Sequence, residues 1–136
     1  MRASTIIFSL LAAVSVEGLE TYSCKGSGLC GKIIYQSDCD RAVNKINPNK
    51  EYYSGGDSSG ECSRHNIYGH GCGVFVQGNR SKDGSLCTAT GKQLKDWYGH
   101  IRARGGCKIC GSVSFDDPLN TGCKIKIDYV TGCKHE

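Results

Sequence analysis

Ten cysteines in a chain of 136 residues constrain the fold more than any other feature of the sequence. A short chain this rich in cysteine is typical of a secreted domain held by disulfides, because a small core contributes little stability by itself. The even number predicts five bridges, although the count leaves the pairing open. The ten predicted half-cystines are Cys24, Cys30, Cys39, Cys62, Cys72, Cys87, Cys107, Cys110, Cys123 and Cys133.

The Cys-x-x-Cys pair formed by Cys107 and Cys110, within GGCKICGS, admits three kinds of chemistry. Half of a zinc site needs further ligands at matching spacing, and the four histidines show no such spacing beside the pair. A thioredoxin-like redox pair stands at the start of a helix, whereas this pair follows a predicted helix and its glycines. Two half-cystines with distant partners are therefore favoured, and no metal ion or cofactor is predicted.

The first 18 residues have the pattern of a secretory signal peptide. Arg2 precedes an apolar run, 6–16, that is too short to span a bilayer. Cleavage is expected after Gly18, with Ser15 as the alternative, so that residues 19–136 form one secreted, extracellular domain. The net charge of +4 agrees with attraction to acidic cell surfaces and equally with ordinary solubility.

Two segments have the apolar spacing of amphipathic helices. The first, at about 39–47, is expected to begin after the capping residue Asp38 and to end at Asn47-Pro48. The second follows Thr90, which is predicted to form a capping box with Gln93, and ends near Gly105, which suits a left-handed cap. The stripes expected to face the core are Cys39, Ala42, Val43 and Ile46 in the first helix and Leu94, Trp97, Tyr98 and Ile101 in the second.

Four segments, 32–35, 73–77, 113–115 and 124–130, are predicted strands, and the Gly/Ser-rich segment 54–60 is a predicted flexible loop. The last strand alternates cleanly, with Ile125, Ile127 and Tyr129 on one face. Lys124, Lys126 and Asp128 lie on the other, solvent-facing side. A strand with one polar face is typical of an antiparallel sheet whose opposite face is covered by helices.

Acid–base hydrolysis is the main alternative to a binding function. A small secreted ribonuclease would need a general base, a general acid and a cation for the phosphate. Charged residues in a small domain are mostly solvated, and nothing in the spacing of the candidates fixes their geometry. We therefore predict no catalytic residues and no enzymatic activity. The candidates for the alternative are Glu61, His65, His100 and Arg102.

A third possibility is a protein that binds cell-wall carbohydrate. Tyr52, Tyr53 and Tyr68 could form an aromatic platform for a sugar, although tyrosines of this kind lie more often at the edge of a core. Asn79 begins an Asn-Arg-Ser sequence that is an acceptor for N-glycosylation. Either feature would agree with an extracellular location.

Four motifs occur in a familiar order: CKGSGLCG at 24–31, CGVFVQ at 72–77, GGCKICGS at 105–112 and IDYVTGC at 127–133. Together they resemble the killer protein four (KP-four) family of smut fungal killer toxins, over most of residues 19–136. The resemblance implies an α/β (α+β) sandwich: an antiparallel β-sheet with two helices packed on one face, rich in disulfides. It also implies a killer toxin or effector that inhibits the growth of target cells, in the founding toxin by blocking calcium channels.

The same resemblance implies a disulfide pairing and a functional position. The implied bridges are Cys24–Cys107, Cys30–Cys110, Cys62–Cys87 and Cys72–Cys133, which leaves Cys39 with Cys123. His70 stands where the founding toxin has a lysine that is implicated in activity. Histidine is mostly neutral at pH 7, so that it presents a weaker charge than lysine.

A toxin-like binding protein is expected to act through exposed basic residues, because charge complementarity and shape determine such contacts. The expected partner is a cell-surface protein of a target cell, with a calcium channel as the candidate that the resemblance supplies. We expect a monomer that binds no nucleic acid and does not insert stably into membranes. The predicted target-binding residues are His70, Arg102, Arg104, Lys108, Lys124 and Lys126.

Overall fold

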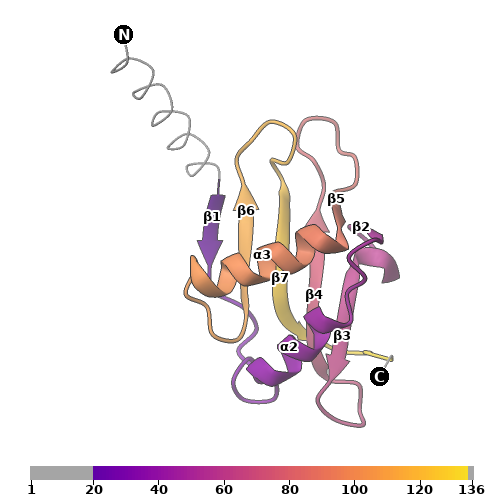
Figure 1. Ribbon diagram of the computed structural model, residues 1–136, viewed down its shortest axis with the longest axis vertical. Helices are drawn as coiled ribbons and strands as arrows, with labels where there is room; N and C mark the ends of the chain where they lie inside the picture. The colour runs from indigo at the N-terminus through magenta and orange to yellow at the C-terminus, as the bar shows by residue number, and fades with distance from the viewer. Residues whose placement is uncertain (1–19, 135–136) are drawn as a thin grey trace.

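The computed structural model describes residues 20–134 (Figure 1), so the predicted signal peptide, 1–18, lies outside the described residues. In chain order the elements are β1 (Glu20–Ser23), α2 (Gln36–Asn44), β2 (Glu51–Tyr53), the short 3-10 helix η1 (Asp57–Ser59), β3 (Gly60–Arg64), β4 (Gly71–Gly78), β5 (Thr88–Thr90), α3 (Gly91–Ala103), β6 (Gly111–Phe115) and β7 (Cys123–Val130).

The main sheet has five antiparallel strands in the order β1-β6-β7-β4-β3. Its centre is the pair β4 and β7, which are in register from Gly71 opposite Val130 to Gly78 opposite Cys123. A separate two-stranded sheet joins β2 to β5. The predicted strands at 73–77, 113–115 and 124–130 are confirmed as β4, β6 and β7.

Both α-helices of the described residues lie on the same face of the main sheet, as Figure 1 shows. The core lies between the two layers and contains Val74 and Val76 of β4, Val113 of β6, and Ile125 and Ile127 of β7. The helices contribute their apolar stripes to it: Cys39 and Ala42 from α2, and Leu94, Tyr98 and Ile101 from α3. The predicted α+β fold, rich in disulfides, is therefore confirmed.

The opposite, open face of the sheet carries the alternate residues of each strand. Lys124 and Lys126 of β7 pair with Ser114 and Ser112 of β6, so all four side chains are on this face. Burial shows which face is open, because the alternate residues Ile125 and Ile127 of the same strand are almost completely buried against the helices.

The second helix begins as predicted, whereas the first both begins and ends about three residues earlier than predicted, at Gln36 and Asn44. Thr90 caps α3 by accepting a hydrogen bond from the Gln93 amide at 3.1 Å, while the Gln93 side chain accepts one from the Thr90 amide at 2.8 Å. Asp38 was predicted to precede the first helix, but α2 starts at Gln36. The Asp38 carboxylate instead reaches back from the first turn to the amide of Tyr35, at 2.9 Å.

Three further predictions of local structure were wrong. Residues 32–35 form a turn with one isolated bridge from Ile34 to Cys30, because the Cys30 disulfide holds the chain in a tight loop there. The loop predicted at 54–60 contains η1 and the first residue of β3. The left-handed glycine after α3 is Gly106, with φ 69°, and Gly105 is required for another reason: a Cβ there would lie 2.7 Å from the Ile101 carbonyl oxygen.

Five disulfides join all ten cysteines, which lie within the described residues. The bridges Cys24–Cys107 and Cys30–Cys110 were correctly predicted. The other three predicted pairings, 62–87, 72–133 and 39–123, were wrong. The observed bridges are Cys39–Cys72, Cys62–Cys133 and Cys87–Cys123.

A basic loop surface as the candidate functional site

Four loops meet at one end of the main sheet, the lower end in Figure 1. They are 24–35 after β1, 64–70 from the last residue of β3 to the start of β4, 105–110 before β6, and 131–134 after β7. The antiparallel order of the strands brings them together, because β1, β3 and β7 end where β4 and β6 begin. We call these four loops the basic end.

The basic end carries five lysines and arginines, two histidines and no carboxylate. The charged residues are Lys25, Lys32, Arg64, Lys108 and Lys134, and the histidines are His65 and His70. The loops at the opposite end, 79–87 and 116–122, carry Asp83, Asp116 and Asp117 besides two basic residues. The molecule is therefore electrically polar along its strands, with an excess of positive charge at one end.

Two carboxylates beside the basic end, Asp38 and Asp128, have partners within the protein. Asp38 is buried and accepts hydrogen bonds from Arg41 and from His65 Nδ1, the latter at 3.0 Å. Asp128 pairs with Lys126 at 3.2 Å and accepts the amide of Ser27 at 3.0 Å. Their charges are consequently compensated inside the protein and do not offset the lysines of the loops.

Disulfides hold the basic end in place. Cys24–Cys107 and Cys30–Cys110 join the loop 24–35 to the loop 105–110, and Cys62–Cys133 attaches the loop 131–134 to β3. The remaining loop, 64–70, is attached to the loop 131–134 through the backbone, since the Cys133 amide donates to the Gly69 carbonyl at 3.0 Å. Loops fixed in this way lose little conformational entropy when they bind a partner.

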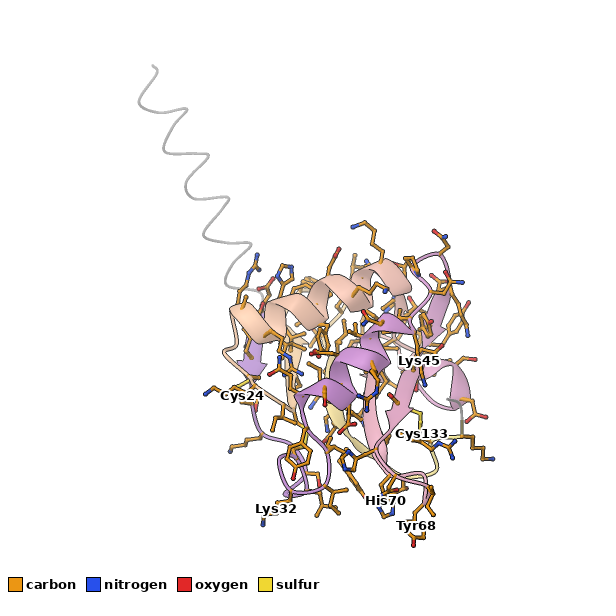
Figure 2. All side chains as sticks on the ribbon, turned by 60° about the horizontal axis from the view of Figure 1, so that its bottom comes forward. Cys24, Lys32, Lys45, Tyr68, His70 and Cys133 are labelled. Carbon is orange, nitrogen blue, oxygen red and sulfur yellow. A yellow bond between two sulfur atoms is a disulfide. The ribbon has the colours of Figure 1, made fainter. Side chains whose placement is uncertain are left out.

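The hairpin loop between β3 and β4 presents apolar side chains to solvent. Ile67 is 84% exposed and Tyr68 is 77% exposed, the highest values among the large hydrophobic residues of the described chain that are exposed. We call these two residues the hairpin tip. Figure 2 shows Tyr68 beside His70 at the same end of the molecule as Lys32.

The histidines of this hairpin are packed against other rings. His70 lies between Tyr68 and Tyr129, with centroid separations of 6.3 Å and 5.8 Å. His65 lies 5.8 Å from the ring of Tyr35. Aromatic contacts of this kind fix the orientation of the loop side chains, so that the surface is presented in one arrangement.

The predicted target-binding residues are divided among three places. His70 and Lys108 lie in the basic end, and Lys124 and Lys126 lie on the open face of the sheet. Arg102 is engaged inside the protein: its guanidinium donates to the carbonyls of Cys107 and Ile109 at 3.0 Å and 2.8 Å. Arg104 pairs with Glu20 at 3.2 Å.

Several residues of this surface were missed by sequence reasoning: Lys25, Lys32, Arg64, Ile67, Tyr68 as an apolar contact, and Lys134. The signal that could have found them is the absence of acidic residues from the segments 22–37 and 97–115, which hold half of the surface. These segments form one surface only because the sheet topology places the loops side by side.

The residues considered for hydrolysis have separate environments. Glu61 accepts a hydrogen bond from the Tyr52 hydroxyl at 3.3 Å, and His65 contacts Asp38. His100 packs edge-on against Trp97 at 5.1 Å, while Arg102 holds the loop 105–110. The structure therefore does not assemble this set into one site.

The three tyrosines considered as a carbohydrate platform are also separated. Tyr52 is completely buried and donates its hydroxyl proton to Glu61, Tyr53 is half exposed on β2, and Tyr68 lies on the hairpin tip. Asn79, the predicted glycosylation residue, is exposed, and its side-chain amide donates to the Gly84 carbonyl at 3.0 Å. An attached glycan would lie at the end of the sheet opposite to the basic end.

A cleft of about 560 Å³ lies next to the basic end, between the segment 56–62 and the residues after β7. Phe75 and the Cys62–Cys133 bridge line it, together with charges of both signs from Lys50, Asp57 and Lys134. Mixed charges of this kind do not select an anion or a cation. None of the helices in residues 20–134 is long and apolar enough to cross a membrane.

Comparison with protein families gives a match over residues 22–133, to the MU117 meiotically up-regulated gene family. The chain belongs to this family. The resemblance to the KP-four killer toxins was therefore wrong, and the calcium-channel activity that it implied loses its basis. Neither the curated proteins nor the solved structures give a match to the chain. The cysteine-containing motifs that carried the resemblance are shared features of a disulfide framework rather than a mark of that toxin family.

Proposed function

We propose that this MU117-family protein is a secreted, non-enzymatic binding protein that acts on the surface of target cells through its basic end. The observation that carries the proposal is the convergence of four acid-free loops, with five lysines and arginines, at one disulfide-held end of the sheet. A concentrated charge of one sign attracts a surface of the opposite sign and speeds encounter with it.

Three properties of the chain support an extracellular role. The five disulfides need an oxidising environment to form, and such conditions are found along the secretory route and outside the cell. The sequence pattern of residues 1–18 agrees with entry into that route. Rigid loops are also suited to a protein that works by contact, because binding then costs little ordering entropy.

A toxin or effector is the form of this function that we propose, with inhibited growth of the bound cells as its result. The test uses oxidised residues 19–136 carrying a fluorescent label, applied to a panel of yeast, plant and bacterial cells. We expect binding to at least one cell type, reversed in about 1 M NaCl, where the Debye length falls to about 3 Å. Growth of the bound cells should slow. Binding that salt leaves unchanged would contradict the proposal.

Hydrolysis is a second candidate that one observation favours. The Asp38 carboxylate contacts His65 Nδ1 at 3.0 Å, so that the other ring nitrogen is available, and Arg41 lies beside the pair. The same contacts also cap α2 and attach the β3–β4 hairpin to it, which is a structural role. An assay for RNA cleavage distinguishes a catalytic role of the Asp38–His65 contact from a structural one. We expect no cleavage, and growth inhibition should persist in a His65→Gln variant.

A further inference from the structure

We propose that the partner of the basic end is the anionic surface of a lipid bilayer, with Ile67 and Tyr68 seated among the lipid headgroups. This inference rests on the proposed function and names the surface that it requires. The association is peripheral and reversible, because two side chains enter the interface and no helix of the described residues can span the membrane.

The hairpin loop holds its tip outward by its own hydrogen bonds. The His65 amide donates to the His70 carbonyl at 2.7 Å, which closes the loop. The Asn66 side-chain oxygen then accepts the amides of Tyr68 and His70 at 3.0 Å and 3.3 Å. Polar backbone groups are thereby satisfied within the loop, so that entry into a less polar environment leaves fewer of them unpaired.

The composition of the tip suits the boundary between water and lipid. Ile67 is apolar and 84% exposed, so that transfer from water into the interface is favourable. Tyr68 has an apolar ring and a polar hydroxyl, and tyrosine is enriched at the level of lipid headgroups for that reason. Tyr68 directly follows Ile67 in the chain, and its ring lies 6.3 Å from that of His70.

The charges around the tip match an anionic membrane. Lys32 and Lys134 are exposed in the neighbouring loops, and Figure 2 shows Lys32 on the same side as Tyr68. Each lysine or arginine near a membrane rich in anionic lipid strengthens binding by about fivefold. No carboxylate occurs in the four loops to oppose this attraction.

The distribution of these features favours a bilayer over a protein as partner. Protein interfaces bury about 800 Å² on each side around a contiguous apolar centre. Here the two most exposed apolar side chains of the four loops, Ile67 and Tyr68, lie together on one projecting hairpin, while the positive charge is spread over all four loops. A diffuse charge with a small apolar anchor is the pattern that a fluid, anionic surface accepts.

Flotation with lipid vesicles tests the inference, using oxidised residues 19–136 and vesicles of phosphatidylcholine with and without phosphatidylserine. We expect binding only when phosphatidylserine is present. An Ile67→Ser/Tyr68→Ser variant should bind about tenfold more weakly or worse, since it loses the apolar transfer of two side chains. The matched control is Leu86→Ser/Leu119→Ser, which removes two exposed leucines from the opposite end and should bind as the unchanged protein does.

A fluorescence measurement locates the tip without relying on affinity. In a Tyr68→Trp variant the emission should shift to shorter wavelength on addition of the anionic vesicles, whereas a Leu119→Trp variant should show no added shift. Equal loss of binding in both serine variants, or an unshifted emission for Tyr68→Trp, would overturn the inference.

The outcomes also separate this inference from the proposed function. A protein that binds cells in a salt-sensitive way but ignores both kinds of vesicle would overturn lipid recognition and leave the proposed function standing. A protein that binds anionic vesicles but no cells would support lipid recognition and overturn the proposed function.

Discussion

Cys62 and Cys72 lie on neighbouring strands yet project from opposite faces of the sheet. Cys62 of β3 is paired with Gly73, and Cys72 of β4 is paired with Ser63, so the two cysteines are one position out of register. Cys72 therefore meets Cys39 of α2 in the core, whereas Cys62 meets Cys133 on the open face. This alternation explains why the pairing implied by the resemblance failed for the middle of the chain.

The bridges between the two ends of the chain are expected to provide much of its stability. Cys30 and Cys110 are separated by 80 residues, and closing a loop of that length stabilises a domain by about 4 kcal/mol in the chain-entropy model. A Cys30→Ser/Cys110→Ser variant should be poorly secreted or unfold at a much lower temperature. Thermal unfolding of the purified variant measures this, and an unchanged midpoint would refute the expectation.

Arg102 is expected to matter for stability rather than for target binding. Its guanidinium donates to two loop carbonyls and to the Tyr98 hydroxyl, so Arg102→Met removes the donor that the part-buried carbonyls of Cys107 and Ile109 share. The free energy of unfolding should fall by about 2–3 kcal/mol. The control, Arg104→Met, removes an exposed ion pair with Glu20 and should lower the free energy of unfolding far less. Denaturant unfolding compares them, and equal losses would contradict this assignment.

Two glycines of α3 are predicted to respond to alanine in opposite ways. A Cβ at Gly91 would lie 1.8 Å from the carbonyl oxygen of Asn47, so Gly91→Ala should destabilise the fold although alanine favours helices. A Cβ at Gly99 would meet nothing within 4 Å, and Gly99→Ala should stabilise by up to about 1 kcal/mol. Denaturant unfolding of the pair measures the difference, and changes of the same sign would count against the helix placement.

Tyr98 is expected to make the stability of the fold fall at alkaline pH. Burial, with a hydrogen bond to Asp40 as the next cause, raises the pKa of Tyr98 from 10.0 to about 12. The folded state thus keeps a proton that the unfolded chain loses, so the contribution of Tyr98 is complete below pH 10 and disappears as pH rises toward 12. Unfolding measured across this range should decline less steeply for Tyr98→Phe. Parallel declines would show that Tyr98 is not the cause.

The second helix and the strands β4, β6 and β7 could be predicted because each has a strong local signal. Thr90 and Gln93 define a capping box, and the residues Ile125 and Ile127 alternate with lysines along β7. Strands β1, β2, β3 and β5 have three to five residues and contain no Val, Ile or Phe, so their pairing depends on partners distant in sequence.

The candidate site was predicted only in part, because it is a property of the topology. His70 and Lys108 were predicted from the sequence as target-binding residues. Lys25, Lys32 and Lys134 each look like an ordinary solvated lysine in the sequence. Their grouping requires the order of the sheet and the bridge from Cys62 to Cys133, neither of which follows from local sequence. The misleading toxin resemblance had a similar origin, since glycine-flanked cysteines recur wherever short loops carry disulfides.

Charge reversal at the basic end tests the central claim most directly. Oxidised Lys32→Glu/Lys134→Glu protein is compared with Lys82→Glu/Lys92→Glu protein, which has the same net charge but retains the basic end; all four lysines are exposed. Binding of the labelled proteins to susceptible cells is measured at low salt. We predict that the first variant loses at least about tenfold in affinity while the second stays near the unchanged protein. Equal binding by the two variants would contradict the assignment of the basic end as the functional surface.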